Sequence, residues 1–298
     1  MQTKKHSNNV KTLPYLLPVM LIIVIVVLYP LINAFYVSFH QWDLATGGRM
    51  FYIGPGNYLD IIHDQYYWSA IARSLFYVLL VVPVELVLGT FIAELLNHEL
   101  KGQRLWRLIF ILPMMITPVV AAMLWKIIYD SQFGVLNWIL SLLGMGPQVW
   151  LGNPKPAMFS VAVIDIWQNT PFVILIMLAS LQSIPGEIIE AAMIDGAGKW
   201  QIFRHITLVY LKNALLLSAI FRIVDSFRVF DNIYVLTKGG PGRATEVISV
   251  YTYKTGFSLL KLGLSASQSF VLLALTLIMA VPLIIAMLRG IGLQRGSA

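Results

Sequence analysis

Four charged residues recur at three-residue steps within an otherwise apolar stretch of the sequence. They are Arg222, Asp225, Arg228 and Asp231. An ionised side chain at the centre of a lipid bilayer costs at least about 2.5 to 3.5 kcal/mol on insertion scales, so charges in a membrane helix are candidates for function. Because their signs alternate at helical spacing, the four groups could also pair along one helix. The pattern leaves two interpretations open, mutual pairing and contact with a solute pathway.

A second polar cluster interrupts another apolar stretch shortly before Pro171. The cluster consists of Asp165, Trp167, Gln168 and Asn169. These side chains could line a sugar-sized passage, or they could hydrogen-bond to a neighbouring helix. Glu85 and Glu94 are further carboxylates in an apolar stretch. From the two clusters, and from Asn232 directly after Asp231, we take as candidate pathway residues Asp165, Trp167, Gln168, Asn169, Arg228 and Asn232.

Motifs for catalysis, metal binding and nucleotide binding are missing from the sequence. It contains no cysteine, which excludes disulfides, thiolate ligands and thiol nucleophiles. Gly198-Lys199 comes nearest to a phosphate-binding loop, but Trp200 follows it and Met193 stands where the first glycine belongs. The five histidines are far apart and none has the spacing of a metal pair on a helix. We therefore expect a non-catalytic chain without a cofactor, and any ATP hydrolysis must occur in another subunit.

The segment 184–208 is too polar to cross a membrane, yet its apolar residues recur at helical spacing. Pro185 suits a first helical turn, and the acidic groups behind it favour the positive end of the helix dipole. Gly196 and Gly198 should end or bend the helix. The segment predicts a short helix whose apolar stripe could bind a partner, pack onto the chain's own spans or lie in lipid headgroups. The stripe consists of Ile189, Ala192, Met193, Gly196, Trp200 and Phe203.

The elements that must position these groups are membrane helices. The 298 residues are 58% hydrophobic and only 12% charged, whereas soluble domains are about 25% charged. The first apolar stretch is roughly twice as long as a signal-peptide core of about 7 to 15 residues, so we expect it to be retained. The sequence predicts an all-α integral membrane protein with about six spans. They lie at about 13–39, 71–97, 106–129, 158–182, 208–233 and 267–289.

The net charge of +7 is better explained by the orientation of the chain in a membrane than by nucleic-acid binding. The basic residues form no single stripe with interleaved aromatics, so we expect no nucleic-acid partner. Basic residues in short connections mark the cytoplasmic side of a membrane protein, which places both termini in the cytoplasm. The residues on the predicted cytoplasmic side are Lys4, Lys5, Lys11, Lys101, Arg104, Arg107, Lys199, Arg204, Lys212, Arg289 and Arg295.

Part of the segment 184–208 resembles a known family. Its residues Glu190-Ala191-Ala192-Met193-Ile194-Asp195-Gly196-Ala197, with Phe203, Ile206 and Leu208 behind them, are similar to the E-A-A loop in permease subunits of bacterial binding-protein-dependent ABC importers. In that family the loop forms the cytoplasmic coupling helix, which inserts into a cleft of the ATPase subunit. The resemblance implies docking residues Glu190, Ala191, Ala192, Asp195, Gly196 and Ala197. Family members usually have proline where Val209 stands, so the resemblance does not carry the usual kink over to the start of the fifth span.

A second stretch, 230–246, is similar to the sequence after the fifth span in carbohydrate-importing permeases, especially the first permease of the pair. It contains Gly239-Gly240-Pro241-Gly242, which cannot continue a helix and predicts a turn-rich outer loop. The resemblance runs from about Trp68 to the C-terminus. It implies a tail, first helix and outer loop at 1–67 and an ABC importer transmembrane domain at 68–298.

The resemblance implies a type I ABC importer permease fold in the bacterial cytoplasmic (inner) membrane, crossed several times. The expected partners are a second permease subunit, two ATP-binding subunits and an extracytoplasmic solute-binding protein. The chain would contribute half of an alternating-access pathway for a carbohydrate or related glycoside. Oligosaccharides, simple glycosides and glycerol phosphodiesters are all candidate solutes. Two rival classes are an ion-coupled secondary transporter, suggested by the charges near position 225, and a membrane-embedded enzyme.

Overall fold

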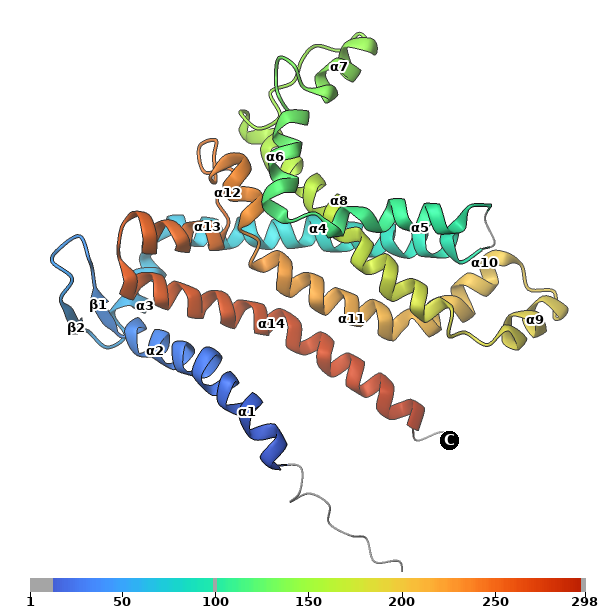
Figure 1. Cartoon of the computed structure of the whole chain (residues 1–298), viewed down its shortest axis with the longest axis horizontal. Coiled ribbons are helices and arrows are strands. Elements are labelled where there is room, and N and C mark those ends of the chain that lie inside the picture. Colours follow the sequence, from blue (N-terminus) through green and yellow to red (C-terminus); the bar gives the residue numbers. More distant parts are fainter. Residues whose placement is uncertain (1–12, 99–100, 296–298) are drawn as a thin grey trace, which may run out of the picture. The chain divides into compact units, whose positions relative to one another are not determined.

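The protein divides into two compact units. A computed structural model describes residues 13–98 and 101–295 (Figure 1). One unit comprises the residues up to Asp64 together with Thr252–Val271, and the other comprises Gln65–Tyr251 together with the residues from Leu272 onward. Each unit is described separately below.

The described residues contain five helices that are long and apolar enough to cross a membrane, or six if one sharply bent pair counts as a span. The five candidate spans are Pro18–Ser38, Gln65–Asn97, Pro154–Leu181, Lys199–Phe227 and Leu262–Arg289. The bent pair joins Gln103–Met115 to Pro118–Ile128 at 101°. This architecture confirms the predicted all-α class with about six spans.

The first unit contains the first span, a small hairpin and the start of the last helix. Its elements are α1 (Leu13–Ile23), a π-helical turn (Val24–Leu28), α2 (Tyr29–Ser38), β1 (His40–Trp42), β2 (Met50–Tyr52), α3 (Gly56–His63), a second π-helical turn (Lys254–Ser258) and the first part of α14 (Leu262–Arg295). The strands are antiparallel, with His40 opposite Tyr52. The amide nitrogen of buried Asn57 donates to the carbonyls of Ser38 and His40, which holds α3 against the end of the first span.

The second unit contains the remaining helices. They are α4 (Gln65–Asn97), α5 (Gln103–Ile111), a 3-10 turn (Leu112–Met115), α6 (Pro118–Ile128), α7 (Val135–Leu142), α8 (Pro154–Leu181), α9 (Gly186–Ile194), α10 (Lys199–Ile202), a π-helical turn (Phe203–Thr207), α11 (Leu208–Phe227), α12 (Asp231–Thr237), most of α13 (Ile248–Tyr253) and the rest of α14. In Figure 1, α5 runs beside α4 whereas α6 turns away from it.

Close packing between α4 and α8 organises this unit. A Cβ atom on Gly89 of α4 would lie 2.6 Å from the side chain of Val173 on α8, so only glycine allows this approach. Small residues at such contacts let membrane helices gain van der Waals packing, because burial from lipid supplies little driving force. The buried side chains of Ala93, Ile174 and Met177 extend the same contact.

The third predicted span, 106–129, is not one helix. Proline disfavours helical backbone at the residue before it, and Thr117, which precedes Pro118, is extended with ψ of 144°. Ile116 is extended as well. The break removes the helical partner of the Ile116 carbonyl, which instead accepts a hydrogen bond from Gln168 Nε2 at 2.7 Å. A side chain on α8 thus permits a bend that lipid alone would disfavour.

The fifth predicted span, 208–233, differs from the structure at both ends. Helix α11 stops at Phe227, and Asp231 begins the separate helix α12. At the other end the helical run continues without a break from Lys199 into α11. Val209 supplies a backbone amide that proline lacks, so the helix is not interrupted there.

Candidate functional site

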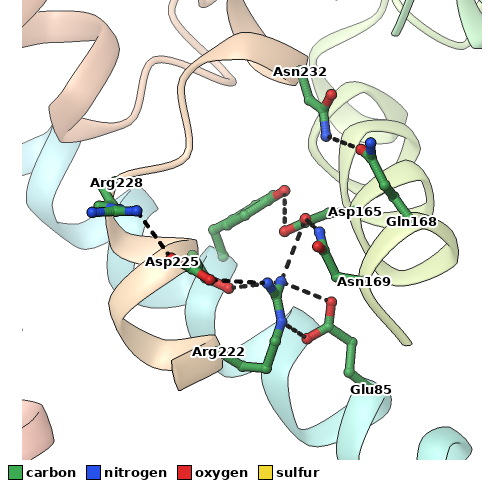
Figure 2. A network of polar contacts seen from close by, with 10 residues as sticks. Glu85, Asp165, Gln168, Asn169, Arg222, Asp225, Arg228 and Asn232 are labelled. Carbon is green, nitrogen blue, oxygen red and sulfur yellow. Dashed lines mark hydrogen bonds and ion pairs between the residues drawn. The ribbon is translucent and has the colours of Figure 1, made fainter. Parts of the chain in front are cut away.

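Side chains from three parts of the second unit surround one cavity of about 310 Å³. The bend between α5 and α6 supplies its apolar wall, and α8 and the segment around the end of α11 supply the polar groups. These polar residues are Asp165, Gln168, Asn169, Arg222, Asp225, Arg228, Asp231 and Asn232. Figure 2 shows most of them pointing toward one another across the helices.

A buried ion pair lies at the base of this cluster. The Arg222 side chain is 4% exposed and that of Glu85 is fully buried. Arg222 Nε and Nη2 donate to the two carboxylate oxygens of Glu85 at 2.6 and 2.9 Å. Such two-point pairing is the strong form of the arginine–carboxylate interaction. It links α11 to α4 at a depth where neither charge could remain alone.

Asp165 connects the ion pair to α8. Its carboxylate lies 3.5 Å from Arg222 Nη2 and accepts the hydroxyl hydrogen of Tyr77 at 2.9 Å. It also accepts a hydrogen bond from the Asn169 amide. Arg222 therefore joins carboxylates of two other helices, and a single side chain holds α4, α8 and α11 together.

The charged series around position 225 pairs only in part along its own helix. The Oδ1 atom of Asp225 lies 3.2 Å from Arg228 Nη2, and its Oδ2 atom lies 3.9 Å from Arg222 Nη1. The interpretation that the four groups pair along one helix therefore holds only in part, because α11 ends at Phe227 and Asp231 begins α12. The principal partner of Arg222 is also on another helix rather than three residues away.

A chain of amides forms the opposite wall. Gln168 Nε2 donates a hydrogen bond to the Ile116 carbonyl, so Gln168 Oε1 faces Asn232. Asn232 Nδ2 donates to that oxygen at 3.3 Å. This arrangement fixes the orientation of both amides. Asn232 is only 3% exposed, and its Oδ1 has no hydrogen-bond partner among the described residues.

Five of the six predicted pathway residues line this cavity: Asp165, Gln168, Asn169, Arg228 and Asn232. Trp167 is not among its lining residues and instead packs edge-on against Trp125, with ring centroids 5.7 Å apart. The candidate set omitted Glu85 and Arg222, although both are charges in apolar stretches. Their isolation in hydrophobic sequence was the signal that could have found them.

The predicted docking residues lie on and just after α9. No residue of α9 is buried, and its apolar end residue Ile194 is 86% exposed. Gly196 has a φ of 80°, a left-handed conformation that glycine adopts without strain. The amides of Gly196 and Ala197 bond to the carbonyls of Met193 and Ala192, which is the hydrogen-bond pattern of a glycine-terminated helix. The predicted end of the helix at Gly196 is confirmed.

The apolar stripe of this segment faces two ways. Ile189 and Met193 line a cavity of about 360 Å³ together with Leu181 and Phe203, so part of the stripe faces the chain's own helices. Trp200, by contrast, is exposed. Within the described residues no group of three or more histidine, aspartate or glutamate side chains could hold a metal ion.

Sequence comparisons identify relatives along nearly the whole chain. A profile of the family described as "Binding-protein-dependent transport system inner membrane component" matches residues 85–290. The probable ABC transporter permease protein y4oQ of Sinorhizobium fredii is 38% identical over 282 residues, which cover 94% of this chain and 91% of that protein. The trehalose/maltose transport system permease protein MalF of Thermococcus litoralis is 37% identical over 253 residues, covering 84% of this chain and 85% of that protein.

The fold is also found in a solved structure. One chain of a bacterial alginate ABC transporter, crystallised in complex with a periplasmic protein that holds an alginate pentasaccharide, matches with a TM-score of 0.78. The identity is 22%, and the match covers 91% of each chain. By its sequence and its helical architecture, the chain belongs to the inner membrane components of binding-protein-dependent transport systems, the permease family of ABC importers.

Proposed function

We propose that this chain forms half of a translocation pathway for a carbohydrate or related glycoside, and that its α9 segment couples the pathway to an ATPase subunit. The observation that carries the proposal is the polar cavity among membrane-spanning helices, because polar groups in such helices are costly unless they serve a pathway or a partner. Amide and carboxylate groups can bind sugar hydroxyls, and the transport system of one relative carries trehalose and maltose by its name.

The chain acts within an assembly in the bacterial cytoplasmic membrane. Its partners are a second permease subunit, two ATP-binding subunits and an extracytoplasmic solute-binding protein. Residues 68–298 make up the transmembrane domain, preceded by a tail, first helix and outer loop at 1–67. Both termini and the α9 segment lie in the cytoplasm, as the distribution of lysine and arginine supports.

Exposure of the α9 segment supports the coupling role. Glu190, Ala191, Asp195 and Gly196 are exposed, and Ile194 adds an apolar side chain that this chain leaves uncovered. An ATPase that grips this surface more tightly in one permease conformation than in the other would shift the equilibrium between them. The pathway would then open to alternate sides as ATP is bound and hydrolysed.

The coupling role is tested by co-purification of the ATPase with the permease pair. Ile194→Glu places a charge at the centre of the proposed interface, so we expect loss of the ATPase and of ATP-dependent uptake. Leu142→Glu on α7 is the matched control, because it adds the same charge at an exposed apolar position elsewhere, and it should retain the ATPase. Full ATPase binding by Ile194→Glu, or ion-driven uptake by this chain alone, would contradict the proposal.

A further inference from the structure

The charges around the cavity do not balance. Three carboxylates line it, those of Asp165, Asp225 and Asp231, against the two guanidinium groups of Arg222 and Arg228. Glu85 adds a fourth carboxylate directly behind Arg222. Charges around a low-dielectric cleft sum to a potential that concentrates ions of the opposite sign and repels those of the same sign.

Both guanidinium groups are already engaged by carboxylates of this chain. Arg222 is held at two points by Glu85 and lies near Asp165, so an anion could reach it only by displacing a buried partner. Arg228 is 70% exposed and pairs with Asp225 at 3.2 Å. An exposed pair of this kind separates easily, but separation uncovers Asp225 and leaves the total charge unchanged. Asp231 has no ion-pair partner among the described residues.

The unpaired polar group on the amide wall is also an acceptor. Because Gln168 fixes the orientation of Asn232, the atom left without a partner is Oδ1 rather than Nδ2. A buried acceptor without a donor costs about 1 to 3 kcal/mol. Oδ1 is covered in this structure, so hydroxyl and ammonium groups could donate to it only after the amide wall moves, and the choice between solutes rests on the charged groups.

From the excess of carboxylates and from the engagement of both guanidinium groups we infer that the cavity selects solutes by charge: it takes hydroxyl-rich solutes that are neutral or cationic and repels uronic, sulfonated and phosphorylated sugars. The inference rests on the proposed function, since it gives the chemical class of solute for the same pathway. It separates this chain from the alginate transporter whose fold it shares, because alginate is an acidic polysaccharide.

The absence of cysteine allows a test that needs no knowledge of the natural solute. Met114 lines the cavity and is 39% exposed. The Met114→Cys variant is assembled into the complete complex in nanodiscs. Separate samples are treated with a cationic reagent, trimethylammonium-ethyl methanethiosulfonate, and an anionic reagent, sulfonato-ethyl methanethiosulfonate. The increase in the mass of this chain with time gives the rate of reaction with each reagent. Ser141→Cys is the control, because the segment 131–152 around it contains no charged residue.

We expect the ratio of cationic to anionic rates to be about ten-fold higher at position 114 than at position 141, the lower end of the effect of a charged cleft on local ion concentration. Adding Asp231→Asn to Met114→Cys should lower that ratio several-fold. Equal ratios at the two positions would overturn the charge inference and leave the pathway intact. No reaction of Met114→Cys with either reagent, with or without ATP, would contradict the pathway itself.

Discussion

At the scale of single residues, Arg222 is the side chain on which the cavity depends. It is buried and bonded at two points to Glu85, and it reaches Asp165 on a third helix. Bringing two charges out of water costs several kcal/mol per ion, and close pairing returns most of that cost. The Arg222–Glu85 pair therefore contributes little to the overall free energy of unfolding. Its main effect is to determine that α11 packs against α4.

Removing one partner of this pair should be far more damaging than removing both. We expect Arg222→Met to lower the free energy of unfolding by about 3 to 5 kcal/mol, because it leaves Glu85 buried and unpaired. The double variant Glu85→Gln with Arg222→Met should recover much of that loss. Thermal unfolding of the purified complex measures both. Arg228→Gln, at an exposed pair, should cost less than about 1 kcal/mol. An equal loss in the single and double variants would refute the pairing energetics.

Asp130 provides a pH-dependent contribution in the loop after α6. Its carboxylate accepts hydrogen bonds from the amides of Gln132 at 2.9 Å and Phe133 at 2.8 Å. These two hydrogen bonds lower the pKa of Asp130 below its ordinary value, and the bond from the Phe133 amide makes the larger contribution. Because the folded-state pKa is the lower one, the stabilisation is present above the unfolded pKa of about 3.9 and is lost as pH falls through the folded value.

Asp130→Asn should therefore lower the melting temperature at pH 7, where the wild-type residue is ionised. As the pH falls below the unfolded pKa of about 3.9 toward the lower folded-state pKa, the difference between wild type and variant should shrink, because protonation removes the negative charge that the amides stabilise. Differential scanning fluorimetry across pH 3 to 7 measures the difference. Gln182→Glu, an exposed change at the end of α8, controls for a general effect of charge. A difference that stays the same from pH 7 down to pH 3 would exclude this role for Asp130, because the unfolded state is mostly protonated at the lower pH.

At the scale of elements, two interruptions of helices build the site. The bend between α5 and α6 brings Ile116 to Gln168, and the stop of α11 at Phe227 lets Asn232 approach the same amide. In each case a backbone or side-chain group released by the interruption finds a partner on α8. A continuous helix through Ile116 would bond that carbonyl to an amide of its own backbone, so Gln168 would lose this partner.

The end of α9 depends on the left-handed backbone at Gly196. We expect Gly196→Ala to cost about 1 to 2 kcal/mol locally, because an L-residue is strained at this φ although the space beside it is open. The amide of Ala197, bonded to the Ala192 carbonyl, should then exchange hydrogen faster, and ATP-dependent uptake should fall. Gly186→Ala is the matched control, since Gly186 begins the same helix in open space without a positive φ. Equal acceleration of exchange in both variants would contradict the prediction.

At the scale of the whole molecule, much of the architecture follows from local patterns. Long apolar runs identify the spans because every backbone polar group in lipid must bond within its own helix. The glycine that ends α9, and the position of five of the six candidate residues at one cavity, also follow from residue type and spacing. The break after Ile116 did not, because prolines occur in many membrane helices and Pro118 by itself does not distinguish a kink from a bend of 101°.

The sequence by itself determined that the chain crosses a membrane, that it carries no catalytic motif, and that charges within its spans need partners. Tertiary structure alone decided which partners those are. Glu85 and Arg222 stand 137 positions apart, and no periodicity connects residues at that separation. Likewise Trp167 and Gln168 are neighbours in sequence, yet one packs against Trp125 and the other reaches the cavity, because adjacent residues on a helix point about 100° apart.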